Sequence, residues 1–219
     1  MSYQEPAVGS TNATQALRSA IKSQYRAALA MLRQAIEQCP EDLWSSRDYA
    51  NPFWRIAYHT LYYTHLYLQP HVSAFRPWKH HQTRIQDLDD IPAPREIENL
   101  CELPHRPPRT GEPYTKAEVL EYWSVCEEMV EGVDALNLFD RESGFPWHSM
   151  PNAEHQIMAI RHIQHHTAQL GVRLRETVEV GIDWVRAGRS AEPGATSAYH
   201  LPSTSQLGVG FKPATRTDS

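Results

Sequence analysis

Four long segments with the apolar periodicity of an α-helix constrain the fold of this chain more than any other feature. They span residues 14–38, 52–69, 115–136 and 152–180. In the first of them, Leu17, Ile21, Tyr25 and Ala28 follow one another at steps of three or four residues. This spacing places apolar side chains on one face of a helix, and no segment shows the alternation typical of a strand. Four such helices predict an all-α four-helix bundle.

The ends of these segments carry the residues that commonly begin and end helices. Asn51 and Pro52 suit the start of the second segment, and Pro70 follows its end. Thr115 and Glu118 have the spacing of a capping box at the start of the third segment. In the fourth, Gly171 is a candidate for close approach of a neighbouring helix.

The rest of the chain divides into tails and one long connection. Residues 1–13 are predicted to be a flexible N-terminal tail, residues 14–187 the bundle, and residues 188–219 an extended or disordered C-terminal tail. The proline-rich residues 70–113 are predicted to be a long loop with a short helix near 95–101, and residues 181–188 to add one further helical turn.

Charge and cysteine content exclude several classes of function. The net charge is -5, from 21 basic and 26 acidic residues, which gives no basic surface for nucleic acid or an anionic membrane. No apolar run is long enough to span a membrane, and the N-terminus lacks the pattern of a signal peptide. The three cysteines, an odd number, form no disulfide or zinc motif. We therefore expect a cytoplasmic protein with a small-molecule substrate.

Histidine is the residue that points to chemistry, with twelve copies in the chain. His162 and His166 are four residues apart on the fourth helix, so both rings lie on one face, one turn apart. His59 lies in the second helix among apolar and aromatic residues, where a buried ring needs a metal or a hydrogen-bond partner. The residues alone leave two hypotheses open: a metal site on His59, His162 and His166, or three core histidines bonded to backbone carbonyls or tyrosines.

Three neutral imidazoles suit Zn, Ni, Fe or Cu and leave at least one coordination position open. Such a site favours catalysis over a purely structural role, although the sequence identifies no catalytic residue. The Glu of the H-E-x-x-H motif is absent between His162 and His166, and no pair of helices carries the Glu-x-x-His motifs of a di-iron bundle. Cys126 lies in the apolar stripe of the third helix and is predicted to be a packing residue.

The segment HIQHHTAQL, residues 162–170, resembles the H-x-x-H-H-x-x-Q-L signature of the DinB/YfiT-like superfamily. NPFWRIAYHTLYY in the second helix and the DWV near the end of the bundle are also similar to that group. The resemblance implies an up-down-down-up four-helix bundle, often a homodimer, with a divalent metal on His59, His162 and His166. It also implies that His165 is not a ligand and that Gln169 is a packing residue or supports a ligand.

The same resemblance implies a class of reaction. Members of the superfamily include transferases and isomerases that use bacillithiol, mycothiol or glutathione. We therefore expect a divalent-metal-dependent thiol S-transferase in detoxification or stress response, with a low-molecular-weight thiol as cofactor. An aromatic pocket built from Trp54, Tyr58, Tyr62 and the loop around Trp147 is expected to hold the substrate. The alternatives are a metal-dependent hydrolase, a metal-binding stress-response or interaction module without turnover, and a bundle without metal.

Overall fold

A computed structural model of the chain describes residues 8–82, 84–88 and 112–188. The α-helices are α1 (Val8–Gln38), α2 (Glu41–Trp44), α3 (Phe53–Tyr67), α5 (Lys116–Met129) and α6 (Asn152–Val178). Two 3-10 helices, η1 (Val72–Ala74) and η2 (Val130–Ala135), complete the elements. No strand occurs in the described part of the chain, which confirms the all-α prediction. None of its helices combines the length and apolar character that a membrane span requires.

Three helix boundaries differ by more than two residues from those that the sequence predicts. Helix α1 begins at Val8, six residues before Thr14, because extending a formed helix adds a hydrogen bond at each residue without a new nucleation cost. The helix predicted over residues 115–136 is α-helical only to Met129, where α5 ends, and continues as 3-10 helix η2 to Ala135. Residues 181–188 form no helical turn. The short helix predicted near 95–101 and the tail from 189 onwards lie outside the described residues.

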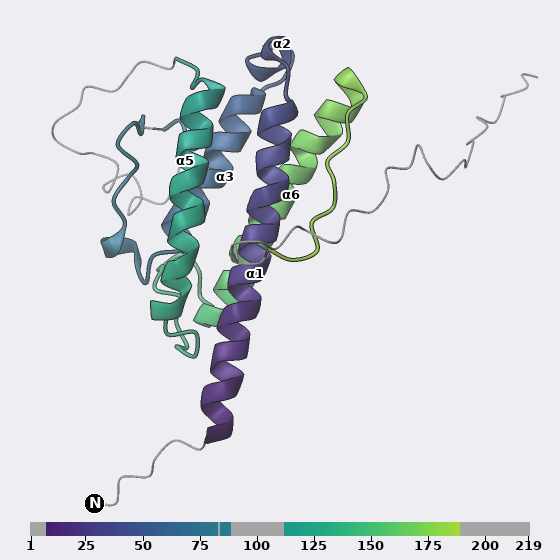
Figure 1. Cartoon of the computed structure of the whole chain (residues 1–219). Coiled ribbons are helices and arrows are strands. Elements are labelled where there is room, and N and C mark those ends of the chain that lie inside the picture. The colour runs from purple at the N-terminus through teal and green to yellow at the C-terminus, as the bar shows by residue number, and fades with distance from the viewer. Residues whose placement is uncertain (1–7, 83, 89–111, 189–219) are drawn as a thin grey trace, which may run out of the picture. The chain divides into compact units, whose positions relative to one another are not determined.

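The four long helices pack side by side (Figure 1), with α1 and α3 each lying against both α5 and α6. Helices α1 and α6 run parallel, since Tyr25 contacts Gln156 while Met31, further along, contacts Gln164. Helix α3 runs antiparallel to α6, because Tyr67 accepts a hydrogen bond from Gln156. Its opposite end is joined to the other end of α6, where Arg173 donates to the carbonyl of Asn51.

Helix α3 is buried on several sides, and its aromatic rings form the centre of the core. The side chains of Tyr58 and Tyr62 are fully buried and that of Trp54 nearly so. Tyr58 stacks on Tyr114 at 4.6 Å between ring centroids. Trp147 lies in the loop before α6, against Phe145. The prediction of an aromatic pocket is therefore wrong, because Trp54, Tyr58 and Tyr62 are core residues.

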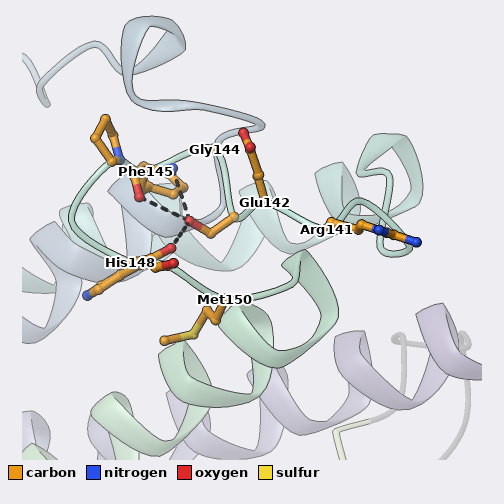
Figure 2. Close-up of a pocket in the computed structure, with 9 residues that line it drawn as sticks. Arg141, Glu142, Gly144, Phe145, His148 and Met150 are labelled. Carbon is orange, nitrogen blue, oxygen red and sulfur yellow. Dashed lines mark hydrogen bonds between the residues drawn. The ribbon is translucent and has the colours of Figure 1, made fainter.

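The loop between η2 and α6 is held by its own hydrogen bonds. The Ser143 hydroxyl lies 2.7 Å from the carbonyl of His148 and 3.1 Å from that of Phe145, and these contacts are dashed in Figure 2. Gly144 has φ +86°, and a Cβ there would lie 2.3 Å from the carbonyl oxygen of Pro70, so glycine is required. Residues 141–146 and 148–150 line a shallow hollow of about 430 Å³ in this loop.

After α6 the chain turns at Glu179, whose φ is 58°, and returns in extended form along α1. The amide of Asp183 donates to the Gln34 side chain at 2.9 Å, and that of Gly188 donates to the Ser23 carbonyl at 2.9 Å. A Cβ on Gly171 would lie 3.0 Å from Ile182. Gly171 therefore admits this returning segment and not a neighbouring helix, which corrects the expectation from the sequence.

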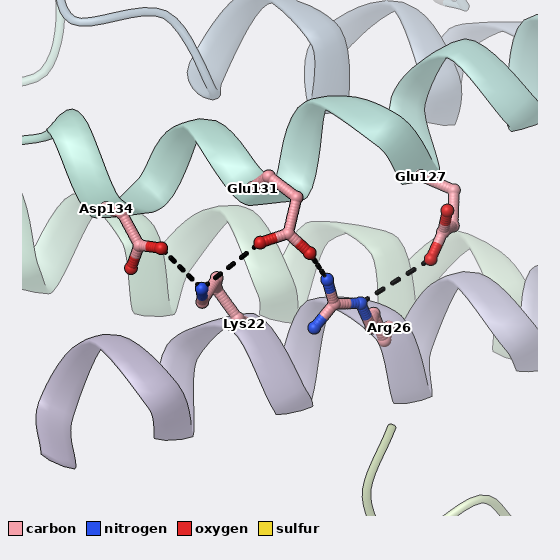
Figure 3. Close-up of polar contacts among 5 residues, drawn as sticks. All are labelled: Lys22, Arg26, Glu127, Glu131 and Asp134. Atoms are coloured by element: carbon pink, nitrogen blue, oxygen red, sulfur yellow. Dashed lines mark hydrogen bonds and ion pairs between the residues drawn. The ribbon is translucent and has the colours of Figure 1, made fainter. Parts of the chain in front are cut away.

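Five charged residues form a network between α1 and the segment made by α5 and η2 (Figure 3). Lys22 bonds Asp134 at 2.6 Å and Glu131 at 3.2 Å. Arg26 contacts Glu131 and lies 3.5 Å from Glu127. The Lys22 side chain is only 14% exposed, whereas Glu131 is 59% exposed. The hydrogen bond to Asp134, opposed by desolvation, raises the pKa of Lys22 above its ordinary value.

Replacing Lys22 with Met, which keeps the apolar stem, should lower the free energy of unfolding by about 1 kcal/mol. Because the folded-state pKa of Lys22 is raised, its contribution is complete below pH 10.5 and is lost as the pH rises through the folded value. Urea unfolding at low and at high salt measures the effect, which should shrink at high salt. Lys79→Met, at an exposed pair with Glu121, is the control and should change stability by less than about 0.5 kcal/mol. Equal losses in the two variants would contradict the prediction.

Candidate metal centre

Antiparallel packing of α3 on α6 brings His59, His162 and His166 together. One ring nitrogen of each lies within 4.8 Å of the others. The Nε2 atom of His162 is 3.1 Å from Nε2 of His59 and 3.1 Å from Nε2 of His166. His166 is buried, while His59 and His162 are half-buried. The three predicted side chains therefore converge on one point, and two of them are half-buried.

Two of these rings have partners that decide where their protons lie. The Nδ1 atom of His59 is 2.5 Å from the backbone carbonyl of Gln86, and Nδ1 of His166 is 2.8 Å from Oε1 of Gln169. Both partners are oxygen atoms that only accept, so each Nδ1 carries the hydrogen and donates it. In a neutral imidazole the other nitrogen then holds a lone pair. His59 and His166 thus direct Nε2 lone pairs towards His162.

No distribution of protons satisfies both contacts of His162 when all three rings are neutral. A hydrogen on its Nε2 can serve one lone pair well but not two, and its buried Nδ1 has no hydrogen-bond partner. Protonation of the rings is disfavoured: burial first, and then the neighbouring histidines, lower the pKa of His162 to about 2. Burial, followed by His166, lowers the pKa of His59 to about 3. A cation at the point of convergence would satisfy all three Nε2 atoms at once.

The side chains around the triad include one that the sequence did not single out. The ring of Tyr63 lies 4.8 Å from that of His59 and 5.6 Å from that of His162, measured between centroids. Its position, four residues after His59, places it on the same helix face and was the available signal. His165 is exposed and contacts His166 without joining the group. Gln169, of the sequence signature, contacts His166 directly.

Several histidines outside the triad pack against the core. The Nδ1 atom of His81 lies 2.5 Å from the Tyr58 hydroxyl, and burial lowers the pKa of His81 to about 4. His148 is also half-buried, against His155. His65 is buried beside Tyr122. His105 and His200 lie outside the described residues. Cys126 is fully buried, with its thiol 3.4 Å from the Leu61 carbonyl, in agreement with a packing role.

The contact between Gln169 and His166 makes a specific prediction for metal affinity. Gln169→Leu removes the acceptor that fixes the His166 ring, and loss of such a partner typically weakens metal binding about 10–100-fold. Competition for Zn²⁺ with a chromophoric chelator measures the change. Gln169→Glu keeps an acceptor oxygen and should retain most of the affinity. Unchanged affinity in Gln169→Leu would mean that packing alone orients His166.

Comparisons of the chain with protein-family models, with curated proteins and with solved structures found no match. The chemistry of the site is therefore inferred from His59, His162, His166 and the residues around them.

Proposed function

We propose that this protein is a metal-dependent enzyme of the DinB/YfiT-like superfamily, which binds one divalent ion on His59, His162 and His166 and transfers a low-molecular-weight thiol to a small electrophilic substrate. The observation that carries the proposal is the convergence of three Nε2 atoms that neutral imidazoles cannot satisfy among themselves. The sequence signature around His162 is the second support.

The directions of the four long helices support membership of that superfamily. Helices α1 and α6 run one way, and α3 runs against α6. Helix α5 runs against α1, because Lys22 bonds Asp134 while Leu29, further along α1, accepts from Trp123. These directions support an up-down-down-up order, which is the order that the resemblance implies.

The donor set supports a divalent ion with open positions. Imidazole nitrogen suits Zn, Ni and Fe, and we propose one of these three as the resident metal. No carboxylate of the described residues joins the three histidines. A bound divalent ion would lower the pKa of a thiol or water at its open position. The protein would hold the ion in place through α3 and α6 and orient two of its ligands through Gln86 and Gln169.

The surroundings of the triad favour an external thiol over the alternatives. A hydrolase would profit from a general base, and the described residues place no carboxylate beside the triad. Cys39 and Cys126, the two cysteines in the described part of the chain, are buried, so neither can serve as the thiol at the site. Cys101 lies outside the described residues. Because the superfamily that the chain resembles uses low-molecular-weight thiols, we propose a free thiol cofactor as the nucleophile.

A metal-binding module without turnover is the second candidate. One observation favours it: the His59 ring is bonded to the carbonyl of Gln86, so an ion on the triad would also tie the 84–88 segment to α3 and α6. In that case the ion would stabilise the fold or a contact surface. Removal of the triad would then abolish partner binding or lower stability without loss of a reaction.

Metal content and turnover, measured on the same untagged preparation, test the proposal. Protein purified without chelator should contain about one divalent ion per chain, by mass spectrometry, and His162→Ala should lose it. His165→Ala, at the exposed neighbouring ring, is the matched control and should keep the ion. Metal-loaded protein should then accelerate thiol addition to an electrophile. Bound metal without thiol transfer would favour the metal-binding module without turnover. A protein that binds none of Zn, Ni and Fe would contradict both candidates.

A further inference from the structure

The electrostatics of the triad point to the charge of its ligand. His59, His162 and His166 are neutral ligands, so they leave the two positive charges of a divalent ion uncompensated. No aspartate or glutamate among the described residues joins the group. A half-buried dication without a compensating carboxylate favours an anion in its open position, because burial weakens the screening of its charge.

Arg55 adds a further positive charge on the same helix as His59, next to the segment that His59 contacts. It lies one turn before His59 on α3, and residues four apart share a helix face. The Nε atom of Arg55 donates to the carbonyl of Ile85 at 3.4 Å, while His59 donates to the next carbonyl, that of Gln86. Donation to adjacent carbonyls places the guanidinium beside the imidazole.

Within the described residues, no hydrogen bond or ion pair engages the terminal nitrogens of Arg55. Arg26, a half-buried arginine of α1, is paired with Glu127 and Glu131. Arg173 donates to the Asn51 carbonyl and lies over the Tyr49 ring. For Arg55, by contrast, the only hydrogen-bond acceptor among the described residues is the carbonyl of Ile85, which Nε contacts. Its two terminal amino groups retain the fork of donors that matches a carboxylate.

We propose that Arg55 is a specificity residue that binds the carboxylate of the substrate at the metal centre, so that the enzyme selects carboxylate-bearing small molecules. This inference rests on the proposed function, because it requires a metal on the triad. It adds to that function a substrate class and a residue that recognises it.

Cobalt-loaded full-length protein allows a direct test, because the visible spectrum of Co²⁺ changes when a ligand enters its coordination sphere. Acetate is the anionic probe and imidazole the neutral one. Arg55→Gln removes the charge and keeps a donor for the Ile85 carbonyl. It should weaken acetate binding about tenfold or more, in line with the strength of charge-assisted hydrogen bonds, and leave imidazole binding within about threefold. Arg55→Lys should give an intermediate acetate affinity.

Arg175→Met, at an exposed position near the end of α6, removes the same charge and is the matched control; its acetate affinity should stay within about twofold of the wild type. Acetate affinity in Arg55→Gln equal to that of the wild type, at full Co²⁺ loading, would overturn this inference and leave the proposed metal function intact. Equal losses for acetate and imidazole would also overturn it, since they would indicate a structural role. A wild-type protein that takes up no Co²⁺ would overturn both.

Discussion

Zinc added in excess to the chelator-treated protein should raise its midpoint of thermal unfolding by about 10 °C. A ligand that binds only the folded state, at about a thousand times its Kd, adds about 4 kcal/mol to the free energy of unfolding. In a chain of this size each kcal/mol moves the midpoint by about 2–4 °C. The triad joins α3 to α6, and through Gln86 it also holds the 84–88 segment, so unfolding separates the ligands. Differential scanning calorimetry with and without Zn²⁺ measures the shift.

Two variants make this result specific to the triad. His162→Ala removes the ring whose Nε2 contacts both other ligands, and its midpoint should not respond to Zn²⁺. His165→Ala removes the adjacent exposed ring and should respond as the wild type does. A full shift in His162→Ala would mean that Zn²⁺ acts at other histidines, and the triad would lose its main support.

Much of the site could be predicted from the sequence because helices convert spacing into position. Two histidines four residues apart must lie on one face of α6, and a histidine amid the aromatic residues of α3 must face the interior or a neighbouring helix. Their meeting requires only that α3 and α6 pack together. The packing of α3 on α6 was predicted from the family resemblance and from the expectation of a four-helix bundle. The spacing of residues in the sequence does not determine which helices are neighbours.

The remainder of the site depends on contacts that carry no sequence signal. The partner of His59 is a backbone carbonyl, that of Gln86, and any residue type can supply one. The burial of His81 depends on its loop folding against Tyr58, which helical periodicity does not address. The same limit explains why the predicted aromatic pocket was wrong. Aromatic rings on several faces of α3 are compatible with the lining of a pocket or with a core, and in the structure Tyr58 packs in the core against Tyr114 and Tyr122.

The returning segment after α6 shows a different limit. Residues 181–188 form no helix, and Glu179 before them adopts a left-handed conformation that ends α6. Gly188 then lies so close to α1 that a Cβ would be 2.2 Å from the Cβ of Arg26. A glycine at such a contact is chosen by tertiary packing, so its role becomes visible only in the folded structure.

Acidification should unfold the protein at a pH well above that at which its carboxylates titrate. His65, His81 and His155 are not in the triad, and burial lowers the pKa of each to about 4. As the pH falls below 6.5 the unfolded chain takes up protons at these rings, whereas the folded protein does not until about pH 4, so stability is lost across that window. At pH 5 each ring costs about 2 kcal/mol and the three together about 6 kcal/mol. This is a large part of the usual 5–15 kcal/mol of a folded domain.

Urea unfolding of the chelator-treated protein at pH 7.5, 6.0 and 5.0 measures the loss of stability. The three histidines of the triad contribute in the same direction when no metal is bound. His155→Gln removes one buried ring, which lies against Phe145 and His148, and should reduce the slope of stability against pH by up to about 1.4 kcal/mol per unit. His71→Gln, at an exposed ring, should leave the slope unchanged. A free energy of unfolding that stays constant from pH 7.5 to 5.0 would contradict the burial of these rings as neutral groups. A slope that falls in His155→Gln and stays unchanged in His71→Gln would tie acid sensitivity to the buried rings of the core.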